Sequence, residues 1–568
     1  MKRTFTYIAA LSFGLLCMAQ SATDGGAMLQ QDIKGTARFM SMGGAFGALG
    51  GDMTTISYNP AGIGVYRSSE IGITMDFNFQ NTSTDFTGTK VDDNKFKFLL
   101  NNGGYIGAIN LNNDVMPNFN WGITYNRKAN FNRQFSGVAG NLNNSVTNYI
   151  AGVANDAGVL EEDVATTSRF DPYMNPNYQA PWLTILGYDS YYISPSSNNP
   201  SDPRWVGQFD SNTRGTGYMT TIEKGGIDEY NLGLGGNFYN HVYWGMDFAI
   251  TSLNLHRQTL WGENLTNARV DLGNGFSRYD ASIDLYNDYR VKGLGFNYKF
   301  GVIFKPIQEL RLGFAFHTPT WYDLTEKYYA NTDFTYSQNG QVKEKNGAET
   351  NDGYDGVADY SFRTPWRFIG SIAGVIGNKF ILSADVDWQG AQYMHFSQPQ
   401  YEDYWGWDYW YAPQKAPSMA SNYDLNPGTD PYYYINGDAK DYYKTSVTFR
   451  IGAEYRIIPQ LSIRAGYAYT NSPVKEAAKN GQMTIYTADP SPSYEFDNDI
   501  NYLSCGLGYR YQAFYIDLAY MYRSRSSEWH AYSPFIGDDN YANSKSGGPV
   551  GKIKTNDNQL VMSLGFKF

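Results

Sequence analysis

Hydrophobic and polar residues alternate with a period of two in segments that recur from Glu70 to the last residue, and this alternation constrains the fold most. Residues 445–457 are a clear example, in which Val447, Phe449, Ile451, Ala453, Tyr455 and Ile457 alternate with Thr448, Arg450, Gly452, Glu454 and Arg456. Successive side chains of a strand point to opposite faces. Arginine and aspartate at strand centres do not suit a soluble sandwich, whose inner face is apolar. The pattern predicts an all-β fold, a transmembrane antiparallel β-barrel with lipid outside and a polar lumen inside.

The lengths of the connections between these segments favour an up-and-down barrel. Short connections are predicted at 113–118, 240–241, 305–309, 377–378, 459–460 and 512–513. Long ones are predicted at about 81–94, 132–225, 259–288, 322–357, 390–441, 473–498 and 527–552. Short periplasmic turns that alternate with long extracellular loops are typical of outer-membrane barrels. The count between them predicts about fourteen strands over residues 69–568, with both ends of the barrel on the periplasmic side.

The first residues indicate export. Lys2 and Arg3 precede a short apolar run at residues 5–17, and Cys17-Met18-Ala19 offers a small-residue cleavage site. This pattern predicts a secretory signal peptide over residues 1–19. A lipoprotein signal centred on Cys17 is less favoured, because Leu16 stands where a small residue is wanted. Cys505 is the only cysteine after residue 19, so we expect no intrachain disulfide and a stability that comes from a large β-structure.

Composition excludes several classes of function. The net charge of −11 argues against nucleic acid as a partner. After the signal peptide no apolar run reaches the roughly 18 residues of a membrane-spanning helix. No nucleotide motif or metal-ligand cluster stands out, so we expect no cofactor and no metal. The five histidines show no grouping with serine and acid like that of a lipase, so we expect no enzyme; they are His241, His256, His317, His395 and His530.

The last strand carries an assembly signal. Leu560, Met562, Leu564, Phe566 and Phe568 share one face, and Phe568 is the final residue. An amphipathic last strand that ends in Phe566 and Phe568 resembles the signal read by the barrel assembly machinery of Gram-negative bacteria. We therefore expect a monomeric barrel in the cell outer membrane, surrounded by outer-membrane lipids and lipopolysaccharide.

A glycine-rich segment at residues 20–68 precedes the first strand. Its small residues include Gly43, Gly44, Gly47, Gly50, Gly51, Asn59, Pro60 and Ala61. It is not a phosphate-binding loop, because no Gly-Lys-Ser/Thr follows the glycines. Glycine permits close backbone approach, so the segment is suited to fold inward and fill the lumen as a hatch. A solvated tail is less favoured, because Phe39, Met40, Phe46 and Leu49 are too many hydrophobic residues for one.

The chain resembles a known family at several places in order. The glycine-rich segment is followed by Asn59-Pro60-Ala61-Gly62, and further matches lie at residues 293–319, at Thr364-Pro365 leading to 385–388, and at residues 450–473. These features are similar to the FadL/TodX family of outer-membrane transporters for long-chain fatty acids and aromatic hydrocarbons. The resemblance covers nearly all of the chain after the signal peptide, but not the long loops.

The resemblance implies a mechanism as well as a fold. It implies a fourteen-stranded barrel, gated by the hatch, that passes hydrophobic small molecules by facilitated diffusion and releases them sideways through a gap at a kink in the third strand. That strand is expected at about 118–131, where Gly122 is the only glycine. Gly122 is a candidate for the kink, although glycine in a strand more often marks a close contact.

The aromatic outer loop at 390–441 leaves a second function open. Trp405, Trp407 and Trp410 are candidates for ligand capture, with loop packing as the competing interpretation. The alternative function is therefore a receptor for haemin or another surface ligand, or an adhesin, that uses the long outer loops.

Overall fold

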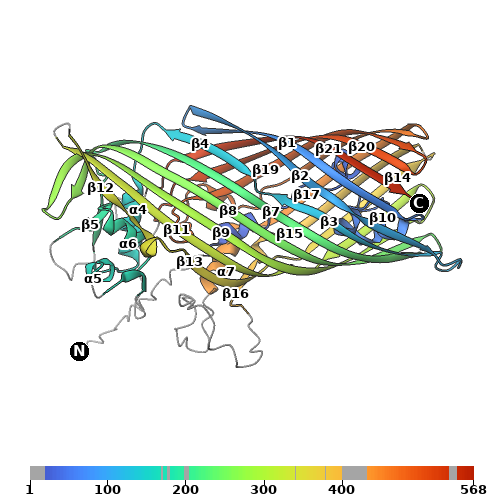
Figure 1. Ribbon diagram of the computed structural model, residues 1–568, viewed down its shortest axis with the longest axis horizontal. Coiled ribbons are helices and arrows are strands. Elements are labelled where there is room, and N and C mark those ends of the chain that lie inside the picture. The colour runs from blue at the N-terminus through green and yellow to red at the C-terminus, as the bar shows by residue number, and fades with distance from the viewer. Residues whose placement is uncertain are drawn as a thin grey trace, which may run out of the picture.

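The computed structural model describes residues 20–167, 170–174, 180–197, 204–338, 341–377, 379–399, 432–535 and 546–568. Its strands form one long tube, with long loops and helices at one end and short turns together with the C-terminus at the other (Figure 1). We call these the long-loop end and the short-turn end. The wall is a closed antiparallel barrel of fourteen strands, as the alternation predicts. Among the described residues, no helix is long and apolar enough to cross a membrane.

The barrel closes between its first and last strands. β1 (Glu70–Phe86) pairs with β2 (Thr89–Asn110) on one side and with β21 (Val550–Lys567) on the other. Ser69 and Phe568 exchange backbone hydrogen bonds of 2.9 and 3.0 Å. Both ends of the wall therefore meet at the short-turn end, as predicted.

Between β2 and β21 the wall continues in chain order. Its first half consists of β3 (Asn118–Asn130) with β4 (Arg133–Ala139), β7 (Arg214–Phe238), β8 (Val242–Asp271), β9 (Phe276–Phe304), and β10 (Leu310–His317) with β11 (Trp321–Gln338). Its second half consists of β13 (Gly356–Arg363) with β14 (Arg367–Ile376), β15 (Phe380–Gly390) with β16 (His395–Ser397), β17 (Thr445–Ile458), β18 (Leu461–Thr470), β19 (Tyr494–Tyr511) and β20 (Phe514–His530). Pro319 and Pro365 lie in two of the interruptions within split strands, since proline cannot donate to a ladder.

The two faces of the wall differ as the alternation predicts. On β17 the outward Phe449 and Ile451 are 53% and 47% exposed, whereas the lumen-facing Arg450 and Glu454 are buried. The outer wall is therefore apolar where it meets lipid, and the charged residues lie inside.

The strands are longer than the sequence predicts, and this corrects the loop assignments. Residues 259–288 are strand except for 272–275, and residues 81–94 are strand except for Thr87 and Gly88. Residues 322–357 contain β12 (Gln341–Glu349), which pairs with β11, and η3 (Thr350–Gly353). The strands continue past the apolar band as long hairpins. Beyond that band the inner face of the hairpin is apolar: Trp261, Leu265 and Ile283 are buried in one cluster with the helices of the long-loop end. The pattern of a membrane strand, with the apolar face outward and the polar face inward, therefore does not continue there.

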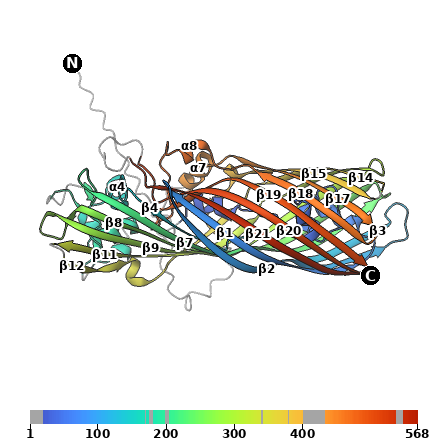
Figure 2. The same cartoon turned by 90° about the horizontal axis from the view of Figure 1, so that it is seen from above.

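Helices gather at the long-loop end and inside the tube (Figures 1 and 2). Between β4 and β7 lie α4 (Val146–Asp156), α5 (Glu161–Val164), η2 (Pro172–Met174), α6 (Trp182–Asp189), β5 (Ile193–Pro195) and β6 (Trp205–Gly207). η4 (Ala391–Tyr393), α7 (Tyr433–Tyr442) and α8 (Glu476–Lys479) belong to later connections. The N-terminal segment forms α1 (Ala22–Met28), α2 (Ala37–Ser41), α3 (Thr55–Tyr58) and η1 (Pro60–Val65).

Candidate functional site

The N-terminal segment lies in the lumen, and we keep the name hatch for residues 20–68. Phe39, Met40 and Phe46 of the hatch are at most 4% exposed and pack in one cluster with Ala468 and Ile369 of the wall. Residues 1–19, the predicted signal peptide, lie outside the described part of the chain.

Glycines let the hatch backbone touch the wall directly, and this explains the composition of residues 43–64. Gly43 has a φ of +61°, and a Cβ there would lie 2.9 Å from the amide nitrogen of Tyr467. On the wall, a Cβ at Gly466 would lie 2.2 Å from the amide nitrogen of Gly43. A Cβ at Gly47 would overlap the side chain of Ser371. Hatch and wall therefore meet with no side chain between their backbones.

The other predicted hatch residues hold its shape. Gly44, Gly50 and Gly51 have positive φ, and Pro60 and Ala61 form the first turn of η1. The side-chain oxygen of Asn59 caps η1 by accepting from the Ala61 N–H at 3.1 Å. Its amide nitrogen donates to the carbonyl of Gly47 at 2.5 Å. Asn59 thus ties the two halves of the hatch together.

Substitution of Gly466 by valine is expected to loosen the hatch. The new side chain has no room beside Gly43, and overpacking of this kind costs about 3 kcal/mol. Gly370→Val is the matched control, because a Cβ at Gly370 would meet only the Trp388 ring at 3.5 Å. The temperature at which the purified barrel loses its heat-resistant gel mobility should fall for Gly466→Val and stay unchanged for Gly370→Val. Equal temperatures for the two variants would contradict the backbone contact.

Buried ion pairs fasten the hatch to the wall. Lys34 lies 2.5 Å from Asp76 of β1, and Arg38 lies 2.9 Å from Glu454 of β17. Asp32 lies 2.9 Å from Arg523 of β20. Separation of a buried pair leaves an uncompensated charge, so these pairs are costly to break. Together they hold the hatch against three separate strands.

The ladder between β2 and β3 stops partway along the wall. Its last pair is Asn102 with Asn126. From that pair toward the long-loop end, β2 forms a ladder only with β1, and β4 forms a ladder only with β7. We call this break, between residues 89–101 of β2 and 127–139 of β3 and β4, the open seam.

The part of the open seam at residues 96–101 of β2 lies within the apolar band of the wall, whereas the outward residues beyond it, Lys90, Asp92 and Asn94, are polar. Phe96, Phe98 and Leu100 point outward from the unpaired part of β2, with 56%, 51% and 38% of their surface exposed. Within the hydrocarbon layer, unpaired strand edges are tolerated only where they face protein or a cavity. Something inside the barrel must therefore satisfy the backbone of the seam.

Asp32 of the hatch takes the place of β2 at the seam. The Asp32 N–H donates to the carbonyl of Lys128 at 2.8 Å, and the Asn130 N–H donates to the Asp32 carboxylate at 2.9 Å. Further along, the Ser136 N–H donates to the carboxylate of Asp93 on β2 at 2.8 Å. Asp32 of the hatch and the Asp93 side chain thus replace some of the missing strand-to-strand hydrogen bonds.

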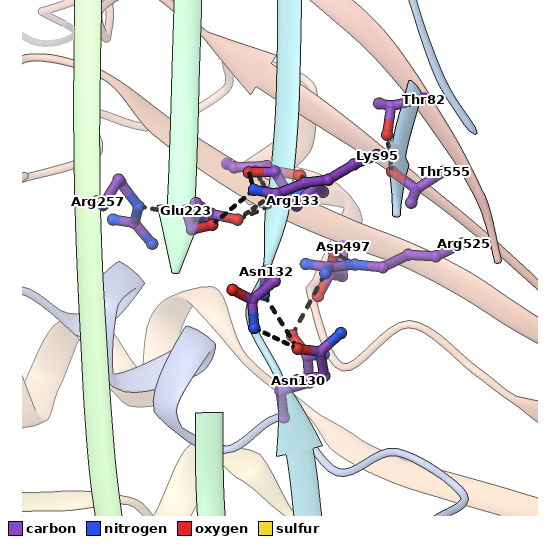
Figure 3. A network of polar contacts seen from close by, with 12 residues as sticks. Thr82, Lys95, Asn130, Asn132, Arg133, Glu223, Arg257, Asp497, Arg525 and Thr555 are labelled. Carbon is purple, nitrogen blue, oxygen red and sulfur yellow. Dashed lines mark hydrogen bonds and ion pairs between the residues drawn. The ribbon is translucent and has the colours of Figure 1, made fainter. Parts of the chain in front are cut away.

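A polar network links the seam, at its part nearer the long-loop end, to the first helix of the hatch. Figure 3 shows the part of this network that runs from Arg133 through Glu223 to Arg257. Arg133 of β4 lies 2.8 Å from Glu223 of β7, and Glu223 lies 3.0 Å from Arg257 of β8. Arg257 lies 2.8 Å from Asp24 of α1. Lys95 of β2 donates weakly to the carbonyl of Arg133, at 3.4 Å. Charged contacts thus connect the first helix of the hatch with β4 at the seam.

Gly122 is not the site of the break, and of the two interpretations left open for it the structure favours the close contact. It pairs regularly with Ile106 of β2 and Gly233 of β7. A Cβ there would lie 3.0 Å from the Ile56 side chain, so the glycine serves a close contact with the hatch. The strand instead deforms between Arg127 and Asn132, where a bulge precedes the end of β3. The loss of alternation over residues 127–132 was the available signal.

Two small cavities lie beside the hatch in the lumen. One of about 50 Å³ is lined by residues 28–31, Lys128 and His317. Another of about 30 Å³ is lined by residues 31–34, Lys128 and Tyr58. Gln31 of the hatch and Lys128 of β3 line both cavities. Trp405, Trp407 and Trp410, the predicted ligand-capture residues, lie outside the described residues.

Comparison with known proteins agrees with this architecture. A Pseudomonas aeruginosa FadL homologue is 14% identical, with 95% of this chain and 99% of that chain covered and a TM-score of 0.50. The toluene transporter TodX of P. putida is 10% identical, with 94% and 99% covered and a TM-score of 0.45. The toluene transporter TbuX of Ralstonia pickettii is 13% identical, with the same coverage and TM-score. No curated protein matches the chain in sequence. Residues 244–530 match the family described as outer membrane protein transport protein (OMPP1/FadL/TodX), and the chain belongs to that family.

Proposed function

We propose that this protein carries hydrophobic small molecules across the outer membrane by passive facilitated diffusion, with the hatch as the gate and the open seam as a sideways exit. One observation carries the proposal: the wall is unpaired within its apolar band, and Asp32 of the hatch closes the opening from inside. Unpaired strand edges are costly within the hydrocarbon layer, so a break at this depth is better explained by transport than by stability.

The cavities suggest the route. In the proposed route, a solute from the long-loop end first occupies the cavity that residues 28–31 of the hatch line. Displacement of residues 28–34 joins this cavity to the one beside Asp32 and Lys128. Residues 126–128 line that second cavity, and the ladder to β2 ends at Asn126. The opened passage therefore leads to the open seam.

Sideways release suits an apolar cargo. A polar pore that ends in water would force the solute to expose its surface, at a cost of roughly 25 cal/mol for each Å² of apolar area. A solute that leaves through the open seam passes from protein directly into hydrocarbon. The related structures are described as toluene transporters and a FadL homologue, so aromatic hydrocarbons and long-chain fatty acids are the classes to test.

Uptake into proteoliposomes tests the function. Vesicles that contain the protein should take up oleate or toluene faster than protein-free vesicles, without any energy source, and should exclude glucose. Because oleate and toluene also cross lipid unaided, the rate is measured as the increment that the protein adds. Equal rates with and without protein, for both solutes, would contradict the proposal. Selective uptake of glucose would indicate a hydrophilic pore instead.

A further inference from the structure

A large hollow lies on the outer wall near the short-turn end. Its volume is about 1050 Å³, and its lining comes from β1, β2, β3, β19, β20 and β21. Ile73, Leu100, Ile123 and Leu564 are among the apolar side chains that line it, and all four are outward and exposed. We call this hollow the outer groove. Its size is at the upper end of the range for small-molecule sites.

Gly103 forms part of the floor of the outer groove. It pairs with Ile73 of β1 and Tyr125 of β3, so it occupies an outward position between two large side chains. A Cβ there would have its nearest neighbours at 3.6 and 3.9 Å, an ordinary contact distance. The wall therefore does not need glycine at this position, and its effect is to leave the groove empty.

The outer groove begins where the open seam begins. Asn102 and Asn126, the last pair of the β2–β3 ladder, are the chain neighbours of Gly103 and Tyr125. The Tyr125 hydroxyl donates to the Asp228 carboxylate at 2.6 Å and also lies 3.3 Å from the carbonyl oxygen of Leu100, across the start of the seam. Tyr125 and Leu100 both line the groove. The groove is therefore continuous with the start of the open seam.

We propose that the outer groove binds the hydrocarbon chain of a long-chain solute as it leaves the open seam, and guides it along the wall toward the short-turn end. The occupant is the transported chain rather than a bilayer lipid, because the groove is continuous with the seam, whereas a lipid chain has the whole circumference of the barrel to contact. The proposal rests on the proposed function and adds the site at which the cargo is held after release.

Filling the groove should slow transport. Gly103→Phe is expected to reduce the protein-dependent rate of oleate uptake by about tenfold, because the ring replaces the space that the chain occupies. Gly370→Phe is the matched control: Gly370 pairs with Phe314 of β10 and Val386 of β15, away from the groove, and has comparable space for a Cβ. Heat-dependent gel mobility verifies that both variants fold, and Gly103→Leu serves if the phenylalanine variant does not.

The outcomes separate the two proposals. Slow uptake by Gly103→Phe alone supports the groove. Equal and normal uptake by both glycine variants overturns the groove and leaves the transport function intact. Absence of protein-dependent uptake by the native protein overturns the function itself.

Native mass spectrometry then identifies the occupant. After incubation with oleate, the native protein should retain at least one oleate more than Gly103→Phe. A variant that instead loses a bound phospholipid, with oleate retention unchanged, would show that the groove holds membrane lipid and would overturn the proposal.

Discussion

Replacement of Asp32 by alanine is expected to leave the hatch unlatched and the barrel leaky. The substitution removes the carboxylate that accepts from Asn130 and pairs with Arg523, and the side chains of Asp32 and Arg523 are only 2% and 7% exposed. Loss of one partner of a buried pair costs about 3 kcal/mol, which corresponds to roughly a hundredfold increase in the open population. Ion conductance across a planar bilayer should rise accordingly.

Asp32→Asn provides the control for this experiment. An asparagine oxygen still accepts the Asn130 N–H but carries no charge for Arg523. Its conductance should therefore lie between those of the native protein and Asp32→Ala. If Asp32→Ala conducts no more than the native protein, the closure assigned to the carboxylate is wrong.

Deletion of residues 24–60 is expected to give a folded barrel with a permanently open lumen. The wall closes through the pairing of β1 with β21, which does not involve the hatch. The wall charges that lose hatch partners, Asp76, Glu454 and Arg523, then face water in the lumen and are solvated by it. Conductance should exceed that of Asp32→Ala, and the barrel should admit polar solutes such as glucose.

Two results would count against this account of the hatch. A deletion variant that fails to assemble would show that the hatch is part of the folding core rather than a gate. Unchanged conductance in a folded variant would show that another part of the chain closes the lumen.

The barrel wall could be predicted from the sequence because the alternation of each strand depends only on residues that are neighbours in the chain. The alternation along β17 predicts that Arg450 and Glu454 face the lumen, and both are buried. The alternation along β21 in the same way predicts which of its residues face outward. The ends of the strands were not predicted from alternation, because in hairpins that pass beyond lipid, such as residues 259–288, the apolar residues face inward onto the helices of the long-loop end instead of outward onto lipid.

The candidate site depends on contacts between distant parts of the chain, and the sequence shows them poorly. The glycines of residues 43–64 indicated close packing, and the structure supplies the opposing glycines, such as Gly466. Asp32 gave no local signal, since its partners Asn130 and Arg523 lie far away in the sequence. A kink was predicted at Gly122 because it is the only glycine in the expected strand. The bulge after Arg127 has no residue type that marks it in the sequence.

The most direct test of sideways release is to find where the solute touches the protein. A long-chain fatty acid with a photoreactive group is supplied to the long-loop side of the reconstituted protein, and the cross-linked residues are identified by mass spectrometry during uptake. If the solute leaves sideways, adducts are expected beside the open seam, on Leu100, Tyr125 and Lys128. Adducts confined to the lumen at the short-turn end, near Arg67 and Asn118, would show that the solute passes straight through the barrel and would contradict sideways release through the open seam.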